Sequence, residues 1–240
     1  MLFRSLVFWL DSVPLQVRLF RDHLLITGGA GIGLGLLKTI CKNKLGDESL
    51  VLPLLGGIGD VESAAPSFAL WDLSRIVRNS LVLSECFNQD LEGLVKRLEA
   101  ESEAKKFNEE FKSFLEQFGS RGPNEWEMAC EVWGTNPQMP LVIIDRMRQA
   151  DDSRAPILRS ERLVEEREKA VESAKNELSR FLHRRFDLIY KCAIDYSQAR
   201  ERSKTVIIDM IHQCRLALRE LGRRASERGG GDPEDLWFGG

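Results

Sequence analysis

Apolar residues are spaced helically along most of the chain. Between residues 161 and 189 they recur every three or four positions, and charged residues occupy the opposite face. A second stripe consists of Val206, Met210, Cys214, Ala217 and Leu221. No run shows the strict alternation that is typical of a strand. The pattern predicts an all-α multi-helix bundle with a long antiparallel helical pair in the C-terminal half.

Residues that start or end helices, such as proline, glycine and N-cap residues, are present at some of the expected boundaries and absent from others. Residues 193–204, between the two long stripes, contain neither proline nor glycine, so a bend and a continuous helix are both compatible with them. Pro14 suits the first turn of an earlier helix. Asp60 is a candidate N-cap of the next helix, and Pro66 is a candidate break within it. Four phenylalanines at helical spacing predict a helix over residues 104–118 that ends at Gly119.

The segment from Ser120 to Pro140 is the most informative loop, because long ordered loops are often functional. Arg121 and Glu125 frame a turn at Gly122 and Pro123, where a guanidinium and a carboxylate can pair and hold the loop. Trp126 and Trp133 would anchor it as apolar packing or as the wall of a ligand site. A structural clamp between two helices and a ligand-facing loop are the two interpretations.

Composition narrows the class of protein without indicating a function. The chain of 240 residues is 43% hydrophobic and 30% charged, which excludes disorder for its bulk. Its net charge of −3 gives no excess that would favour nucleic acid or an acidic membrane. The five cysteines include no C-x-x-C pair, so we expect buried free thiols in a reducing cytoplasm, with no metal site.

Three further patterns carry candidate chemistry. The glycines from Gly28 to Gly35 fit neither the dinucleotide-binding nor the Walker pattern, so close helix packing or a loose helix start is expected there. Asp209 and His212 form a minimal acid–base pair at a spacing that is common by chance. The arginine stripe Arg215, Arg219 and Arg223 could bind phosphate, but acidic neighbours favour a solvated helix face.

The N-terminal part is the most apolar. Its longest uncharged window, Leu24 to Leu37, is shorter than the roughly 20 residues that a spanning helix needs. We therefore divide the chain into an apolar helical stretch over residues 1–50 and a helical region over residues 51–240. Peripheral membrane attachment through residues 1–37 ranks below a cytoplasmic location.

Four segments in the same order resemble the phosphoenolpyruvate-synthase-like proteins, a group that includes rifampicin phosphotransferase. The second of them begins at Phe114 and carries Arg121, Glu125 and both loop tryptophans. The third has the form Y-x-x-x-R-E-x-x-K and includes Arg200 and Glu201, which we expect to pair across helices. In chain order the segments are residues 56–73, 114–137, 196–204 and 221–238.

The resemblance implies the central, all-helical part of a three-part enzyme. In such enzymes an ATP-grasp domain phosphorylates a histidine on a swivelling domain, which carries the phosphoryl group to an acceptor. None of the three histidines here lies in a carrier motif, so the resemblance transfers no catalytic residue. ATP and magnesium are expected only in flanking domains, which would be this chain's partners, together with a small-molecule acceptor.

Two hypotheses from different classes follow. The first is a fragment, or a separately encoded piece, of such a phosphotransferase, which binds the acceptor or links the other domains without chemistry of its own. The second is a stand-alone helical interaction protein without enzyme activity. Under the first hypothesis the candidate substrate-binding or loop-clamp residues are Arg121, Glu125, Trp126, Trp133, Arg200 and Glu201.

Overall fold

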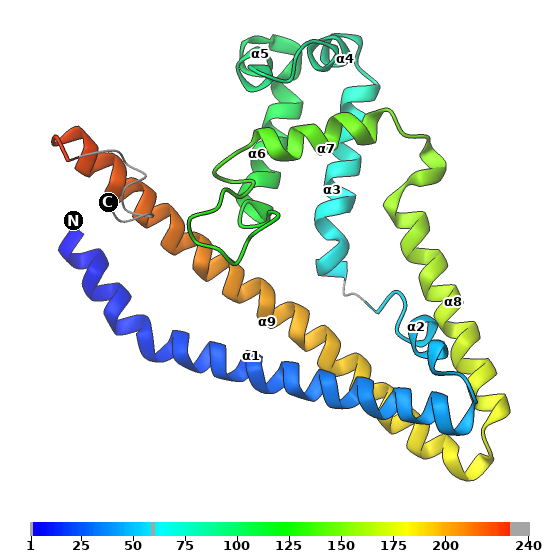
Figure 1. The fold of residues 1–240 in the computed structure, drawn as a ribbon. Coiled ribbons are helices and arrows are strands. Elements are labelled where there is room, and N and C mark those ends of the chain that lie inside the picture. Colours follow the sequence, from blue (N-terminus) through cyan, green and yellow to red (C-terminus); the bar gives the residue numbers. More distant parts are fainter. Residues whose placement is uncertain (1, 59–60, 231–240) are drawn as a thin grey trace. The chain divides into compact units, whose positions relative to one another are not determined.

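The protein is all-α, as the apolar pattern predicts. The computed structural model describes residues 2–58 and 61–230, and this part of the chain contains nine α-helices, three short 3-10 helices and no strand (Figure 1). Asp60 and the segment 232–238, which entered the sequence analysis, lie outside the described residues.

The chain forms two compact units, and each draws on two separate stretches of sequence. The first unit comprises residues 1–64 and 157–207, and the second unit comprises residues 65–156 and 208–240. The proposed division at residue 50 stays a prediction.

The first unit is built from the long helix α1 (Leu2–Lys44) and from the hairpin that α8 (Pro156–Glu177) forms with the first part of α9 (Arg180–Glu227). It also contains η1 (Glu48–Leu50) and α2 (Val51–Leu54) (Figure 1). Its core of buried apolar side chains consists of Leu37, Cys41, Val51, Leu54, Ala174, Leu178, Phe186 and Ala193. The core therefore joins α1 and α2 to the α8–α9 hairpin.

Helix α1 is longer than the sequence predicts. Pro14 lies inside it rather than at its first turn, and the glycine run is helical. A Cβ atom added to Gly33 would lie 2.9 Å from the Cα atom of Ala193, and one added to Gly29 would lie 2.5 Å from the Tyr196 ring. The glycines thus permit a close approach of α1 and α9, which is the helix-packing use that we expected.

The antiparallel pair in the C-terminal half is α8 and the first part of α9. The chain reverses at Leu178 and Ser179, and an ion pair of 2.6 Å joins Lys175 to Asp187 across the hairpin. The predicted helix over residues 161–189 is therefore two helices, whereas residues 193–204 run through without a bend. Ser179 accepts a bond from the Leu182 amide, which starts α9 after the reversal.

Helix α1 also contains an 18-residue window that is apolar enough to cross a membrane. The candidate span is Val13–Lys44, and 22% of its window is buried. Its exposed apolar residues include Leu24, Leu25 and Ile32. A buried core helix can pass the same test, so this composition alone is weak support for a membrane contact.

The second unit packs short helices around a phenylalanine stack. It contains α3 (Val61–Arg78), which Pro66 does not break, α4 (Leu81–Asn88), α5 (Leu94–Ala100), η2 (Ser102–Ala104), α6 (Lys105–Phe118), α7 (Gln138–Arg148), η3 (Asp152–Arg154) and the rest of α9. Phe107, Phe111 and Phe114 are buried and stack in turn at centroid distances of 5.7 and 6.2 Å. These rings fix the predicted helix α6 against α3, α4 and α7.

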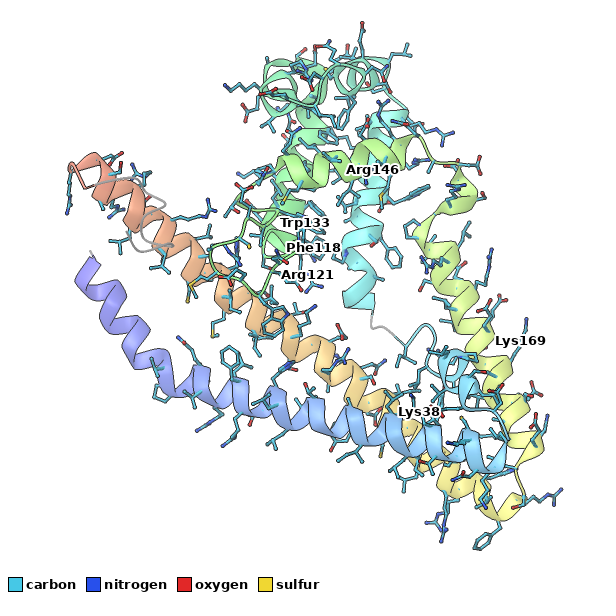
Figure 2. All side chains as sticks on the ribbon, in the orientation of Figure 1. Lys38, Phe118, Arg121, Trp133, Arg146 and Lys169 are labelled. Atoms are coloured by element: carbon cyan, nitrogen blue, oxygen red, sulfur yellow. The ribbon has the colours of Figure 1, made fainter. Side chains whose placement is uncertain are left out.

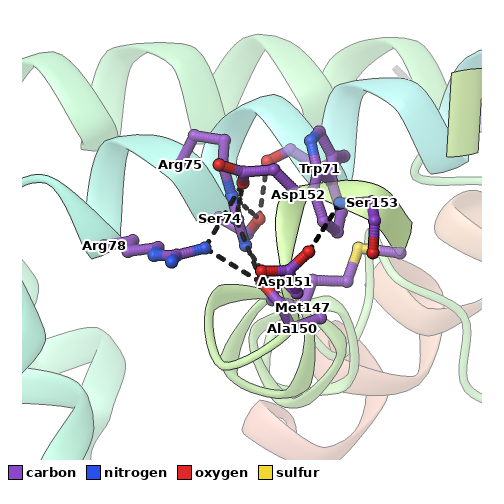
Figure 3. A network of polar contacts seen from close by, with 9 residues as sticks. All are labelled: Trp71, Ser74, Arg75, Arg78, Met147, Ala150, Asp151, Asp152 and Ser153. Atoms are coloured by element: carbon purple, nitrogen blue, oxygen red, sulfur yellow. Dashed lines mark hydrogen bonds and ion pairs between the residues drawn. The ribbon is translucent and has the colours of Figure 1, made fainter. Parts of the chain in front are cut away.

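A polar network ties the end of α3 to the segment after α7 (Figure 3). Arg75 bonds to the Met147 and Ala150 carbonyl oxygens and pairs with Asp152 at 2.6 Å. Its guanidinium lies 4.0 Å from the centre of the Trp71 ring. Arg75 therefore satisfies carbonyl groups at the C-terminal end of α7 that have no partner within the helix.

All five cysteines are free thiols. Only Cys41 is buried, and the other four are partly exposed, so the predicted burial is wrong for those four. Burial raises the pKa of the Cys41 thiol, which keeps it protonated and unreactive.

Candidate functional site

The loop between α6 and α7, residues 119–137, is closed by bonds between its two ends. The Trp133 amide donates to the Arg121 carbonyl oxygen at 2.9 Å, and the Gly134 amide donates to the Gly119 carbonyl oxygen at 2.8 Å. Trp133 also stacks on Phe114, with 5.5 Å between the ring centroids. Figure 2 shows Phe118, Arg121 and Trp133 in this part of the chain.

Glycines permit the close approach of the two ends. A Cβ atom on Gly134 would lie 3.1 Å from the Gly119 carbonyl oxygen and 3.1 Å from Nε2 of His212. A Cβ atom on Gly122 would lie 3.1 Å from the Cα atom of Val132. These contacts are tighter than those that a Cβ atom ordinarily makes, so the loop depends on glycine at these crossings.

Arg121 and Glu125 form the ion pair that their spacing suggests. Nε of Arg121 lies 3.4 Å from Oε2 of Glu125, and both side chains are mostly buried. A pair so enclosed is screened less by solvent than a surface pair. The geometry suits a clamp within the loop, and a role in ligand binding stays a prediction.

The two loop tryptophans differ in environment. Trp133 is partly buried and packs against the phenylalanine core of the second unit. Trp126 is 46% exposed. Trp126 is therefore the one that can offer an aromatic surface to a ligand or partner, and Trp133 serves packing.

Arg200 and Glu201 lie in the first unit, apart in sequence and in unit from the loop. Nη2 of Arg200 is 2.6 Å from Oε1 of Glu201, so the two neighbours pair with each other along α9. This contact runs along one helix, and the expected pairing across helices stays a prediction. The predicted candidates are thus divided between the two units.

The predicted exposure of Arg215 is wrong. The sequence pattern places Arg215 on a solvated helix face, whereas its side chain is fully buried in the second unit. It donates to three loop carbonyl oxygens, those of Glu125, Glu127 and Met128, at 3.0, 2.9 and 3.1 Å. The loop therefore rests on α9 through a single guanidinium with several fixed donors.

The buried stripe of α9 explains the error. The predicted stripe began at Val206, which is exposed, whereas the buried residues are Ile207, Ile208, Ile211, His212 and Arg215. Starting the helical period from the isoleucines would have placed Arg215 on the buried face. A charged residue that continues an apolar stripe is the signal that identifies it.

A second polar group joins the loop to α9. The Ser120 hydroxyl donates to Oδ1 of Asp209 at 2.6 Å. His212, one turn further on, receives a bond at Nδ1 from Nη1 of Arg215 at 3.3 Å. Burial is the larger and the Arg215 charge the smaller cause that lowers the pKa of His212, while Asp209 opposes them. The imidazole is therefore held in its neutral form near pH 7.

These groups face a pocket of about 530 Å³, here named the α6–α9 pocket, within the second unit. It is lined by Lys112, Leu115, Glu116, Gln117, Ser120, Gly134, Asp209, His212, Gln213 and Leu216. Its lining combines polar and charged side chains with the apolar side chains of Leu115 and Leu216. The pocket can hold a small molecule of mixed polarity.

A second pocket lies in the first unit, between α8 and α9. It has a volume of about 570 Å³ and is lined by residues that include Arg167, Tyr190 and Gln198. Arg167 donates to the Gly57 carbonyl oxygen at 2.7 Å, and Gln198 donates to the Ile58 carbonyl oxygen at 3.2 Å. Their polar groups are thus used to hold the segment after α2.

The described residues include no cluster of side chains that is typical of a metal site. Within residues 2–58 and 61–230, no three His, Cys, Asp or Glu side chains come together in a group that could hold an ion. The expectation that ATP and magnesium bind in other domains stays a prediction.

Comparison with known proteins adds one finding. A protein-family model described as rifampicin phosphotransferase fourth domain matches residues 23–201, more than half of the chain. The match begins earlier and ends earlier than the four resembling segments, which extend from residue 56 to residue 238. It includes about half of α1, the whole α6–α7 loop and residues 196–201 of the Y-x-x-x-R-E-x-x-K segment. No curated protein matches the chain.

Proposed function

The chain belongs to the family of the rifampicin phosphotransferase fourth domain, and from this premise we propose that it binds the acceptor, or links the other domains, in an ATP-dependent phosphotransferase. It would do so without chemistry of its own. Its partners would be an ATP-grasp domain and a swivelling histidine domain, of the same or a neighbouring chain. We also propose a cytoplasmic location, because free thiols suit a reducing compartment.

One observation carries the proposal. The α6–α7 loop is fixed by Arg215 and by the Arg121–Glu125 pair, while Trp126 remains accessible on it. A loop held by buried polar bonds can present an aromatic side chain in a defined position, which reduces the entropy cost of binding. Such a loop suits the recognition of an acceptor or of a neighbouring domain.

The proposal is tested by reconstitution. The chain is mixed with purified ATP-grasp and histidine domains of the family, and ATP-dependent phosphoryl transfer to an acceptor is measured. We expect transfer only in the complete mixture, and a loss of about tenfold with Trp126→Ala, which leaves the loop clamp intact. Arg121→Ala should lower transfer as well, because it loosens the loop.

The matched control is Arg159→Ala, at an exposed position on α8 that lies outside the loop. It should leave transfer unchanged. If the partner domains bind but Trp126→Ala transfers normally, the chain links domains without contacting the acceptor. If no partner binds or is activated, the phosphotransferase role is rejected in favour of a stand-alone interaction protein.

A further inference from the structure

We propose that the α6–α9 pocket binds a small uncharged ligand that carries an amide group, with Asp209 as hydrogen-bond acceptor and His212 as donor. This inference stands apart from the proposed function, because a ligand held there need not accept a phosphoryl group. It concerns residues of the second unit alone.

His212 is the proposed hydrogen-bond donor, through its Nε2 atom. An arginine can only donate, so the bond between Arg215 and Nδ1 requires that Nδ1 accept it. The neutral imidazole then carries its hydrogen on Nε2. The side chain is 9% exposed and lines the pocket, and no described residue forms a hydrogen bond with Nε2. A ligand acceptor that reaches this donor exchanges its bond to water for a bond to the ligand.

The glycine at position 134 explains why Nε2 remains available. A Cβ atom there would lie 3.1 Å from Nε2, so any other residue would crowd this edge of the ring. His212 also lines the pocket directly. Gly134 therefore leaves the Nε2 edge of the ring uncovered by a side chain, at a pocket that both residues line.

Asp209 is the proposed hydrogen-bond acceptor, through its second carboxylate oxygen. One of its oxygens, Oδ1, accepts the Ser120 hydroxyl, and within the described chain its other oxygen has no hydrogen-bond donor. Asp209 and His212 are three positions apart on α9, so their side chains lie on the same face. They thus present an acceptor beside a donor.

A primary amide is the complement of this pair, because one of its N–H bonds lies on the same side as its carbonyl oxygen. The surroundings fit an uncharged ligand. Lys112 and Glu116 both line the pocket and offset each other in charge, while Asp209 repels an anion. Leu115 and Leu216 can contact an apolar part of the ligand, such as a ring.

The test uses benzamide as the probe and the 240-residue chain as the protein. Binding is followed by NMR, through the ¹⁵N signal of His212 Nε2 and the backbone amides of Ser120 and Gly134. We expect a saturable shift at millimolar benzamide. Acetophenone, which keeps the carbonyl and lacks the N–H, should bind at least tenfold more weakly, and so should the benzoate anion.

Two variants test the assigned residues. His212→Asn keeps an acceptor toward Arg215 and removes the Nε2 donor, and Asp209→Asn removes the charged acceptor. Each should weaken benzamide binding at least fivefold, judged by the Gly134 amide. Asp195→Asn, at an exposed position on the same helix, is the control and should leave binding unchanged.

Three results would overturn the proposal. They are acetophenone binding as tightly as benzamide, unchanged benzamide binding in both variants, and no saturable shift up to the solubility of benzamide. The ligand series on the unaltered chain keeps the proposal testable even if His212→Asn fails to fold.

Discussion

Arg215 holds the α6–α7 loop through bonds to the Glu125, Glu127 and Met128 carbonyl oxygens, and the Glu127 oxygen also accepts the Cys130 amide at 3.3 Å. Replacing Arg215 with alanine removes these three bonds, and a bond from a charged donor contributes roughly 1.5–3 kcal/mol. We expect Arg215→Ala to lower the free energy of unfolding by about 3 kcal/mol. Arg215→Lys should recover less than half of this loss, because an ammonium group cannot reproduce the planar fork.

Urea unfolding measures the change, and hydrogen exchange locates it. Amides in residues 119–137 should lose protection in Arg215→Ala and keep it in the control Arg228→Ala, at an exposed position. Equal protection of the loop in both variants would show that Arg215 does not hold it.

His212 should make stability depend on pH. Its folded pKa is lowered by burial and by Arg215, so the unfolded chain binds more protons in the interval just below its ordinary value of about 6.5. Stability must then rise with pH through that interval and fall as the pH drops below about 6.5. Arg215 bonds to the ring, the charges of Arg215 and Asp209 act on its pKa, and Lys112 and Glu116 line the same pocket.

The measurement is urea unfolding at several pH values between about 5 and 8. The contribution of one proton cannot exceed about 1.4 kcal/mol per pH unit. We expect His212→Asn to remove this part of the slope, whereas His183→Asn, on the first-unit part of α9, should retain it. An unaltered slope in His212→Asn would contradict the assignment.

At this scale the sequence predicts pairs that are close along the chain better than pairs that are distant. The spacing of Arg121 and Glu125 was sufficient to anticipate their contact, because a turn separates them. The contacts of Arg215 with Glu125 and Glu127 join residues about 90 positions apart. A helical pattern cannot show which loop will cover an arginine, so its charge favoured the solvated face.

Two glycines of α1 allow the effect of helix propensity on stability to be measured apart from the effect of helix packing. Gly33 lies against the backbone of Ala193, whereas a Cβ atom on Gly31 would meet nothing within 4 Å. We expect Gly33→Ala to destabilise the first unit and Gly31→Ala to stabilise it by up to about 1 kcal/mol, the helix propensity difference. Urea unfolding followed by circular dichroism should show opposite changes, and a gain in both variants would contradict the close contact.

The Arg75 network shows which bonds matter between elements. The Asp152 side chain is 76% exposed, so its ion pair contributes little, whereas the bonds from Arg75 to the Met147 and Ala150 carbonyl oxygens are partly buried. The Met147 oxygen also accepts the Ala150 amide, and the Ala150 oxygen also accepts Nη1 of Arg78, so each keeps one donor without Arg75. We expect Arg75→Ala to cost about 2 kcal/mol and Asp152→Ala less than about 0.5 kcal/mol. Thermal unfolding of the two variants tests this ranking, and equal losses would contradict it.

Among the elements, those with a sharp local signal were predicted well. The phenylalanine spacing and Gly119 gave α6 almost to the residue. By contrast, Pro14 and the glycine run suggested interruptions in α1, yet the helix continues. Packing of α1 on α9 outweighs the weak local propensity there. The reversal at Leu178 and Ser179 has no glycine or proline to mark it, so the periodic pattern concealed it.

At the scale of the whole molecule, the two units differ in whether one stretch of sequence or two supply the residues of the core. The core of the first unit combines residues 37–54 with residues 174–193. The core of the second unit lies entirely within residues 70–144. The α6–α7 loop and the α6–α9 pocket of the second unit include contacts with the later residues of α9. A composition shift along the sequence could not reveal this, because units assembled from separate stretches leave no single boundary.

This difference predicts how fragments behave. A fragment of residues 65–156 contains the whole phenylalanine core and the Arg75 network, so it should unfold cooperatively and remain helical. Its α6–α7 loop lacks Asp209, His212 and Arg215. We therefore expect normal hydrogen-exchange protection in α6 and α7, and rapid exchange in residues 119–137.

Adding a peptide of residues 205–230 should restore protection to the loop, while the same peptide with Arg215→Ala should not. A fragment of residues 1–64 is the comparison, because it lacks the α8–α9 half of its core and should not fold. Loop protection in the 65–156 fragment without the peptide would show that α9 is dispensable. An unfolded 65–156 fragment would show that the second unit needs more than its own apolar core, since every buried residue of that core is present in it.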